Sequence, residues 1–393
     1  MLKDTLKFAI REHCPNVRPL RRALSEQKVR QYKRYCLTER EVIEVEHGKT
    51  SLQTVVSKCR ERWSSECSRI AAMSQSHYDR AGISLDESTL NDILFCYFAY
   101  GFTPDEYLCF GLCSRQLKER REFLSDRDRK IIVYSINDII EIERFLDKWK
   151  TYKAYEPFFG RHAIGVHKGS NINDFKRFIE LHEAFVIKNV RLSKGDSVRL
   201  VRREDIEAPE KFYDELVSSG STILEELIVQ SEVMAAINPS SVNTVRVITL
   251  GTKKGVKVVD CFLKAGRNGS FVDNGGAGGL LVGIDSETGL LSTDARDEFS
   301  NAFESHPDTR LHFQGYALPD WNELIELARK LSSTEESIPY IGWDFAHTEH
   351  GWVVVEGNAS SQLIGPQIVT QIGSRKRMLN VLQDVKQIIP IEL

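Results

Sequence analysis

The sequence predicts an α+β fold that follows a mainly helical N-terminal segment. Residues 1–125 carry apolar residues at helical spacing, whereas the chain from about residue 130 consists largely of short apolar runs separated by turn residues. These runs read as antiparallel hairpins and lack the regular strand–helix alternation of a doubly wound sheet. The chain has 393 residues, 41% hydrophobic and 28% charged, so it has the composition of an ordinary soluble globular protein and is long enough for two or three domains.

Residues 51–73, 84–101 and 103–112 predict helices in the first part of the chain. The first of these segments carries one apolar stripe, formed by Leu52, Val55, Val56, Cys59, Trp63, Cys67 and Ile70. The second has an acidic first turn and stops at Gly101, and the third starts with Thr103 as N-cap and Pro104 at the first helical position. We find no catalytic constellation here and expect this segment to provide packing, or a platform for a partner.

The later part of the chain predicts strands with three helices among them. Helices are expected at 137–159, where Pro157 closes the helix, at 209–220 and at 318–333, which is clearly amphipathic. Residues 342–360 predict a strand–turn–strand unit that turns around His350 and Gly351, so His347 and His350 are expected to face solvent. The other strands are expected at 130–136, 183–190, 198–204, 221–229, 243–250, 255–266, 278–285 and 352–358.

Charge and cysteine usage limit the class of protein. The net charge of −3 gives no overall argument for nucleic-acid binding. Residues 1–40 hold 11 Lys and Arg against four acidic residues. This basic arm suits an anionic membrane surface, an acidic partner or a contact with a glycosyltransferase, and the alternative is a solvated helical face. We find no signal-peptide pattern and no apolar run long enough to span a membrane. The eight cysteines form no C-x-x-C pair, so free thiols in a cytoplasmic protein are expected.

Lys188 ends the apolar stretch Phe185–Lys188 of the predicted strand 183–190, and a polar turn follows. A lysine at the end of a buried strand must place its ammonium group near an anion, because an unpaired buried charge is costly. The turn 193–197 contains Gly195 between Ser193 and Ser197, residues that let main-chain N–H groups approach phosphate oxygens. The alternative is an ordinary hairpin with a salt-bridged lysine.

The segment 223–232 combines an apolar strand with three carboxylates. The strand ends at Glu225, Glu226, Leu227 and Ile228, and Glu232 comes six residues after Glu226. Where the strand leaves the core, its main-chain N–H and C=O groups can form hydrogen bonds with the edge of an adenine ring. A carboxylate a few residues later can accept hydrogen bonds from the ribose hydroxyl groups. A solvated strand end is the alternative.

Asp344, Glu356 and Asn358 are the oxygen-bearing residues of the strand–turn–strand unit. Asp344 and Glu356 are 12 residues apart, so a hairpin places them roughly opposite each other, and Glu356 and Asn358 point to the same face. Such converging oxygens favour a hard cation, and Mg²⁺ bound through carboxylates and substrate phosphates is the natural occupant. The alternative is a pair of acids satisfied by arginine or main-chain N–H groups.

The order of these features resembles the ATP-grasp superfamily. More narrowly, the blocks at 238–250, 273–285, 306–309, 340–346 and 353–358 look like the sugar-transfer-associated ATP-grasp proteins found beside polysaccharide biosynthesis enzymes. The resemblance covers about residues 125–385. It implies two α+β subdomains that sandwich ATP, a lysine and flap subdomain at 126–230 and a metal and substrate subdomain at 231–393, after the helical region 1–125.

The resemblance also implies roles for individual residues. Lys148, or its neighbours Lys150 and Lys153, matches the first phosphate-contacting lysine, and Lys188 the second. Residues 193–197 match the flap over the triphosphate, residues 225–228 the adenine hinge, and Glu232 the ribose carboxylate. Asp344, Glu356 and Asn358 match the Mg²⁺ ligands. Arg246 and Arg267 match cations that face the reacting phosphate.

The substrate side has fewer signals. Asn243, Asp273, Asn274 and His306 are the candidate substrate contacts, and the glycines at 275–279 suit either close backbone approach or a wide turn.

The implied activity is ligation of a carboxylate to an amine through an acyl-phosphate, with ATP and Mg²⁺ as cofactors. The carboxylate is expected to be a sugar acid or a relative, and the amine an amino acid or another small amine. Positioning and charge neutralisation would drive such a reaction without a covalent nucleophile from the protein. The alternatives are a phosphotransferase acting on a hydroxyl group, and a nucleotide-binding scaffold without turnover.

Overall fold

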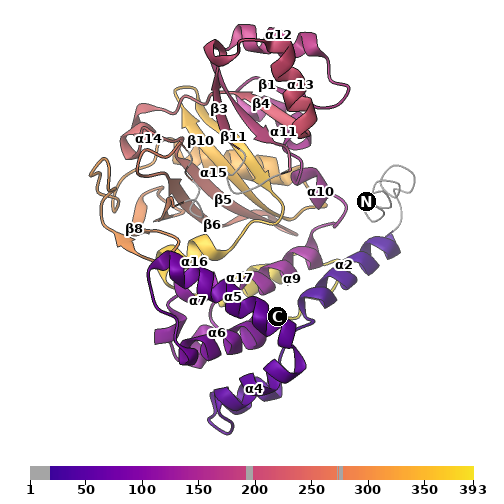
Figure 1. Cartoon of the computed structure of the whole chain (residues 1–393), viewed down its shortest axis with the longest axis vertical. Helices are drawn as coiled ribbons and strands as arrows, with labels where there is room; N and C mark the ends of the chain where they lie inside the picture. Colours follow the sequence, from indigo (N-terminus) through magenta and orange to yellow (C-terminus); the bar gives the residue numbers. More distant parts are fainter. Residues whose placement is uncertain (1–17, 192–197, 272, 274–277) are drawn as a thin grey trace.

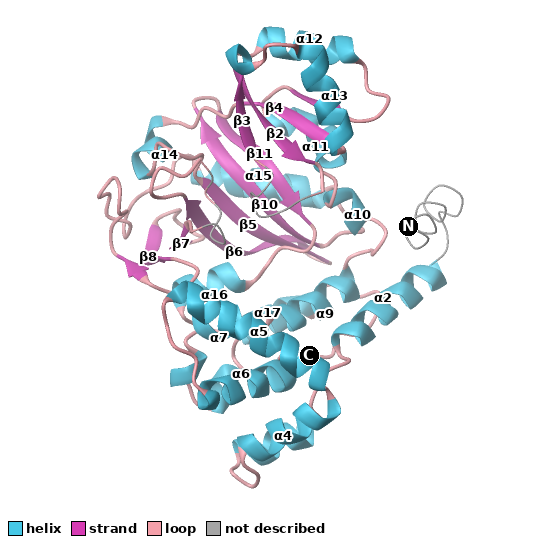
Figure 2. Cartoon of the chain, in the orientation of Figure 1, coloured by secondary structure: helices cyan, strands magenta, loops and turns pink. Residues whose placement is uncertain are grey.

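The computed structural model describes residues 18–191, 198–271, 273 and 278–393. Figure 1 shows a helical part at one end, a seven-stranded sheet in the middle, and a four-stranded sheet at the other end. The colouring by secondary structure in Figure 2 shows that nearly all strands lie in these two sheets, away from the helical part. The predicted α+β fold with a helical N-terminal region is therefore confirmed.

The helical part is formed by residues 18–136 together with two helices from the C-terminal end. Capping boxes fix several helix starts, among them those headed by Thr38, Thr103 and Ser125. Its helices are α2 (Arg18–Tyr32), α3 (Glu39–Glu46), α4 (Leu52–Arg62), α5 (Ser64–Ala81), α6 (Glu87–Tyr100), α7 (Pro104–Cys109), the 3₁₀ helix η1 (Leu112–Ser114), α8 (Leu117–Arg120), α9 (Asp126–Ile136), α16 (Ile364–Thr370) and α17 (Arg375–Leu382). The predicted helices at 51–73, 84–101 and 103–112 are confirmed, the first being broken at Trp63.

Two predictions next to this part were wrong. Residues 130–136 form the end of helix α9 and not a strand, because Ser125 and Asp128 cap a helix whose apolar side chains Ile132 and Ile136 are buried one turn apart. The single helix predicted at 137–159 is two helices, α10 (Ile142–Phe145) and α11 (Lys148–Phe159). Pro157 lies inside α11, which is kinked at Tyr155.

The four-stranded sheet has the order β1-β4-β2-β3, and its neighbours are antiparallel. Its strands are β1 (Ala163–Val166), β2 (Ala184–Asn189), β3 (Arg199–Arg202) and β4 (Thr222–Glu226), followed along the chain by the helix α14 (Glu232–Ile237). The helices α12 (Ile172–Leu181) and α13 (Pro209–Ser219) pack on the sheet through a core that contains Phe175 and Phe178. The predicted strands at 183–190, 198–204 and 221–229 and the helix at 209–220 are confirmed, whereas β1 and α12 were not predicted.

The seven-stranded sheet has the order β11-β10-β5-β6-β7-β8-β9, again with antiparallel neighbours. Its strands are β5 (Thr244–Thr252), β6 (Gly255–Ala265), β7 (Leu280–Ile284), β8 (Leu291–Arg296), β9 (Ala302–Phe303), β10 (Tyr340–Thr348) and β11 (Gly351–Asn358). The helix α15 (Trp321–Ser333), predicted from its amphipathic pattern, packs on β5 and β6. The strands predicted at 243–250, 255–266, 278–285 and 352–358 are confirmed.

The hairpin of β10 and β11 has the predicted register, with Asp344 directly opposite Glu356. His350 is exposed at its turn, as predicted. The prediction that His347 faces solvent was wrong: its side chain is buried, with Nδ1 2.9 Å from Ser231 Oγ and Nε2 3.0 Å from an Asp320 carboxylate oxygen. In the described part of the chain, no helix is both long enough and apolar enough to cross a membrane.

Candidate active site

A cavity of about 480 Å³ is bounded by residues of both sheets. β2 and β4 contribute one wall, and β5, β6, β10 and β11 contribute the other. The structure brings these sequence-predicted residues to the cavity: Lys148, Lys188, Glu225, Glu226, Leu227, Ile228, Arg246, Asp273, Asp344, Glu356 and Asn358. Residues predicted separately for phosphate, base and metal binding thus surround one space.

The partly buried Lys188 and the buried Glu225 form a charged pair on the β2–β4 wall. The Lys188 Nζ atom lies 3.1 Å from a Glu225 carboxylate oxygen, and Arg161 donates to the same oxygen through Nε at 2.8 Å and Nη2 at 2.5 Å. Burial raises the pKa of Glu225, but Arg161 and Lys188 outweigh this effect and bring it down to about 2. Lys188 therefore lines the cavity as a salt-bridged lysine.

Lys148 begins helix α11 and reaches the same cavity from the side. Its main-chain N–H donates to the Val190 carbonyl at 2.9 Å, which ties the start of α11 to the end of β2. Phe145 and Tyr155 pack on Trp343, with ring centroids 5.9 and 5.0 Å apart, and hold this helix pair against the hairpin strand β10. Of the three lysines considered, Lys148 lines the cavity, whereas Lys153 pairs with Glu156.

The end of β4 combines a fixed carboxylate with a free main chain. Glu226 accepts from the His162 main-chain N–H at 3.0 Å and donates its own N–H to the His162 carbonyl at 2.9 Å. Among the described residues, none is hydrogen-bonded to the main chain of Leu227 or Ile228. These two peptide units at the cavity wall can therefore serve a ligand with donors and acceptors along one edge.

Asp344 is held by two cations on the opposite wall. Arg246 donates to both of its carboxylate oxygens, with Nη2 at 2.7 Å from one of them, and the Lys264 Nζ atom lies 2.9 Å from the same oxygen. Burial raises the pKa of Asp344, but the two cations outweigh it and hold that pKa at about 2. Arg246 also donates to the Ser361 hydroxyl at 2.7 Å, so its guanidinium position is fixed on two sides.

Glu356 and Asn358 lie beside this cluster at the end of β11. The residue between them is Gly357. A glycine is needed there because a Cβ atom would lie 2.7 Å from the Trp343 ring. The Asn358 carboxamide oxygen accepts from the Ser360 N–H at 2.8 Å, which fixes the side chain.

The donor set of this edge suits a hard cation. The described residues contain no group of three or more His, Cys, Asp or Glu side chains placed to hold a metal ion. Two carboxylates and an amide oxygen are nevertheless oxygen donors, the type that Mg²⁺ takes together with phosphate oxygens. Asp344 and Glu356 are paired across the two strands and line the cavity with Asn358, so the donor types fit this ion, although Asp344 shares its oxygens with Arg246 and Lys264.

Asp273 adds another carboxylate to the cavity. It accepts from the Thr244 hydroxyl, and burial raises its pKa although Lys264 lies nearby. Asn274 and the turn residues Ser193, Gly195 and Ser197 lie outside the described residues.

Four of the predicted site residues in the described part of the chain do not line the cavity: Glu232, Asn243, Arg267 and His306. Glu232 is exposed at the first position of α14. The buried Asn243 amide donates to the Met234 and Asn238 carbonyls, each at 2.8 Å.

Arg267 and His306 are held in the surrounding framework. Arg267 donates to the Gly278 carbonyl at 2.6 Å and pairs with Asp297 at 3.2 Å. His306 is fully buried, with Nε2 2.8 Å from the Gly266 carbonyl oxygen.

Several cavity residues were not predicted. Lys264 had a usable signal, because it interrupts the apolar strand β6 as Lys188 interrupts β2. Arg161 had none, since it follows Gly160 in a loop whose neighbours in space come from distant strands. The remaining ones include Arg129, Thr244, Phe271, Ser360 and Gln362.

Comparison with known proteins gives one family and a set of remote structural likenesses. The model of the sugar-transfer associated ATP-grasp family matches residues 133–386. No curated protein matches the chain in sequence.

Three solved structures illustrate the remote likeness. The ATP-grasp ligase PsnB, complexed with a minimal precursor, is 13% identical with a TM-score of 0.40, over 63% of this chain and 62% of PsnB, less than two thirds of its length. The D-alanine–D-alanine ligase of Bacillus anthracis is 15% identical with a TM-score of 0.40, over 64% of this chain and 70% of that one. The corresponding ligase of Helicobacter pylori is 13% identical with a TM-score of 0.38, over 66% and 68%.

Proposed function

The chain belongs to the sugar-transfer associated ATP-grasp family, and from this premise we propose that it is an ATP- and Mg²⁺-dependent ligase that joins a carboxylate to an amine. One observation carries the proposal. A single cavity has lysines and free main-chain groups on one wall and a carboxylate–cation cluster on the other. A nucleotide triphosphate has the matching sequence of parts, with a base at one end and a metal-bound polyphosphate at the other.

The residues divide the binding of ATP between the two walls. Leu227 and Ile228 would contact the edge of the adenine through their main chain. Lys148 and Lys188 would contact the phosphates. Lys188 already pairs with Glu225, but an ammonium group has three donors and can therefore donate to a second anion as well. Asp344, Glu356 and Asn358 would hold Mg²⁺, which supplies charge neutralisation on the phosphate oxygens when bound.

The chemistry then requires two displacements. An oxygen of the substrate carboxylate attacks the γ-phosphorus of ATP, the bond to the bridging oxygen breaks, and an acyl-phosphate and ADP result. The amine attacks the acyl carbon and loses a proton, and the C–O bond breaks to release phosphate and leave an amide. Arg246 and Lys264 would stabilise the negative charge that develops on the transferred phosphoryl group, because both are rigidly held before the reaction starts.

The substrates are the finer part of the proposal. The acid would be a sugar acid or a related carboxylate used in polysaccharide or surface-glycan biosynthesis, and the amine an amino acid or another small amine. The name of the family, sugar-transfer associated, supports this choice.

The test is a screen of sugar acids crossed with amino acids and amines, followed by ADP release and mass spectrometry. We expect ADP, free phosphate and an amide in equal amounts for a productive pair. A phosphorylated acid or sugar without free phosphate would instead identify a phosphotransferase. Nucleotide binding without any turnover across the screen would favour a scaffold.

A further inference from the structure

Asp273 is a carboxylate of the candidate ATP cavity without an ion-pair partner among the described residues. Its partly buried side chain lines the cavity and accepts from the Thr244 hydroxyl. Lys264 attracts it from a greater distance, because the Lys264 Nζ atom is engaged with Asp344 at 2.9 Å. A carboxylate that is withdrawn from water is normally paired with a cation, so this one has a place for a cation from a ligand.

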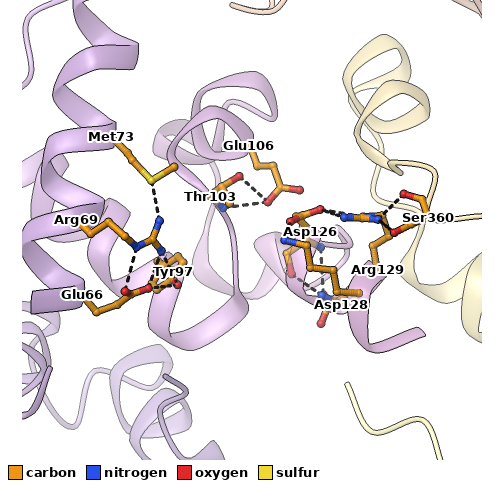
Figure 3. A network of polar contacts seen from close by, with 12 residues as sticks. Glu66, Arg69, Met73, Tyr97, Thr103, Glu106, Asp126, Asp128, Arg129 and Ser360 are labelled. Atoms are coloured by element: carbon orange, nitrogen blue, oxygen red, sulfur yellow. Dashed lines mark hydrogen bonds and ion pairs between the residues drawn. The ribbon is translucent and has the colours of Figure 1, made fainter. Parts of the chain in front are cut away.

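The two arginines at the other ends of the cavity are committed to their own partners. Arg161 pairs with Glu225 on the β2–β4 wall. Arg129 donates through Nη1 to the Ser360 carbonyl and hydroxyl, both at 2.6 Å, and through Nε to Asp126 at 2.8 Å. Figure 3 shows this second arginine reaching from α9 to Ser360 on the segment after β11. Neither guanidinium group therefore neutralises Asp273.

Strand β5 places Asp273 next to the proposed metal edge. Thr244, which donates to Asp273, is two residues from Arg246 and so points to the same face of the strand. Arg246 holds Asp344, and a rise of about 3.4 Å per residue puts the two contacts roughly 7 Å apart along β5. Lys264 is paired with Thr244 across β5 and β6 and reaches Asp344, so it spans this interval. A small group bound to Asp273 would therefore lie beside the phosphate that the metal edge is proposed to hold.

The charge of the loaded cavity favours a cation at this position. The charged side chains that line the cavity nearly balance one another, with six basic and five acidic residues: Arg129, Lys148, Arg161, Lys188, Arg246 and Lys264, and Glu225, Glu226, Asp273, Asp344 and Glu356. Mg²⁺ neutralises only part of the charge of ATP, and the acid substrate adds a further carboxylate. The second substrate of the proposed reaction, an amine, can bring the compensating positive charge.

We propose that Asp273 binds the ammonium group of the amine substrate. The inference rests on the proposed function and deepens it, because it places the amine on the β5–β6 side of the metal edge and selects amines that are protonated at neutral pH.

The same carboxylate is suited to the proton transfer that the second displacement requires. The nitrogen must lose a proton before its lone pair attacks the acyl carbon, so an N–H bond breaks and an O–H bond forms on Asp273. Burial raises the pKa of Asp273, which makes it a better proton acceptor than an exposed aspartate.

The binding test compares amines with molecules in which a hydroxyl replaces the amino group. The full chain is saturated with Mg²⁺ and ADP and titrated by calorimetry with ethanolamine, glycine, L-alanine and L-serine, and with ethylene glycol, glycolate, L-lactate and L-glycerate as their counterparts. Asp273→Asn removes the charge but keeps the shape of the side chain and an oxygen for the Thr244 hydroxyl. Asp294→Asn removes a charge from β8 of the same sheet, outside the cavity, and is the matched control.

We expect at least one amine to bind about tenfold more tightly than its hydroxyl counterpart, since hydrogen bonds between charged groups are stronger than those between neutral ones. Asp273→Asn should lower the affinity for that amine about tenfold and leave the affinity for the counterpart within about threefold of the parent. Asp294→Asn should change neither. ADP affinity within about threefold of the parent in both variants shows that they are folded.

A kinetic test separates binding of the amine from the earlier transfer of the phosphoryl group. For a productive acid from the screen, hydroxylamine, which is largely uncharged at neutral pH, replaces the amine and traps the acyl-phosphate as a hydroxamate. Asp273→Asn should lower kcat/KM for amide formation about 10²-fold or more. Hydroxamate formation should stay within about threefold of the parent, because the first displacement does not use Asp273.

Two outcomes would overturn the inference. One is that the chain binds ADP while no amine binds more tightly than its counterpart, or that Asp273→Asn keeps the preference for the amine. The other is that amide and hydroxamate formation fall together in Asp273→Asn, which would place Asp273 in the first displacement. Failure of the unmodified chain to bind ADP, or a screen without a productive pair, would contradict the proposed function itself, and so the two failures are distinguishable.

Discussion

Replacing Arg161 by methionine should destabilise the protein strongly. Arg161 and Glu225 have side chains only 3% and 4% exposed, and the arginine also donates to the carbonyls of Phe159 and Val354, at 3.1 and 2.6 Å. It thereby ties β4 of one sheet to β11 of the other. Removing one partner of a buried ion pair costs about 3–5 kcal/mol, so Arg161→Met should lower the free energy of unfolding by that amount.

The same change should alter the dependence of stability on pH. The pKa of Glu225 is about 2 in the folded chain against an ordinary value of 4.5, which corresponds to about 3 kcal/mol of stability. Because the folded pKa is depressed, this contribution is present above about pH 4.5 and is lost as the pH falls towards 2. Without Arg161, burial moves the pKa of Glu225 upward. The variant should therefore lose much less stability than the parent as the pH falls from about 4.5 towards 2.

Urea unfolding at a series of pH values, followed by circular dichroism, measures both effects. Arg161→Met combined with Glu225→Leu is the matched comparison, because it removes the whole pair and should recover part of the lost stability. A loss below about 1 kcal/mol for Arg161→Met, with an unchanged pH profile, would refute the reasoning.

Three further predictions concern the opposite wall. Glu356→Gln should abolish ADP release while the chain still binds ADP in the absence of Mg²⁺; retained turnover would contradict the metal assignment. Lys264→Met should lower kcat by about 10²–10³, as expected for loss of one charge-stabilising group, and a change in KM alone would speak against that role. Gly342→Ala should destabilise the chain by about 1–3 kcal/mol, because the added Cβ atom would lie 2.2 Å from the Ser361 hydroxyl oxygen. Gly251→Ala is the control, since its Cβ atom would meet only an ordinary contact at 3.4 Å. Equal melting temperatures for the two variants would contradict the packing argument.

The strands with β-branched runs were the predictable part of the fold. The pairing of Asp344 with Glu356 was predicted, but the turn position explains it only in part. The turn pairs Thr348 with Gly351, and a bulge between Asp344 and Phe345 shifts the register so that Glu356 lies opposite Asp344. Residues 130–136 failed because a short apolar run fits a buried helix turn as well as a strand, and here the cap at Ser125 decided in favour of the helix. The strand β1 has only four residues, too few for a periodic pattern.

The candidate site was predictable only where its residues follow strands. Lys188, Glu226 and Glu356 could be placed because a strand end fixes where the next side chains go. Arg161 could not, since its importance depends on Glu225 and on main-chain carbonyls far along the chain. The position of Glu232 could not be predicted either, because sequence distance from Glu226 does not reveal that helix α14 starts there and leaves the side chain exposed.

The most direct test of the account follows the oxygen atoms of the acid substrate. An acid labelled with ¹⁸O in both carboxylate oxygens is incubated with ATP, Mg²⁺ and its amine partner, and the phosphate is analysed by mass spectrometry. An acyl-phosphate pathway predicts one ¹⁸O atom in the released phosphate for every amide formed. Amide formation with unlabelled phosphate, or a phosphorylated product with no free phosphate, would contradict the proposed ligase mechanism.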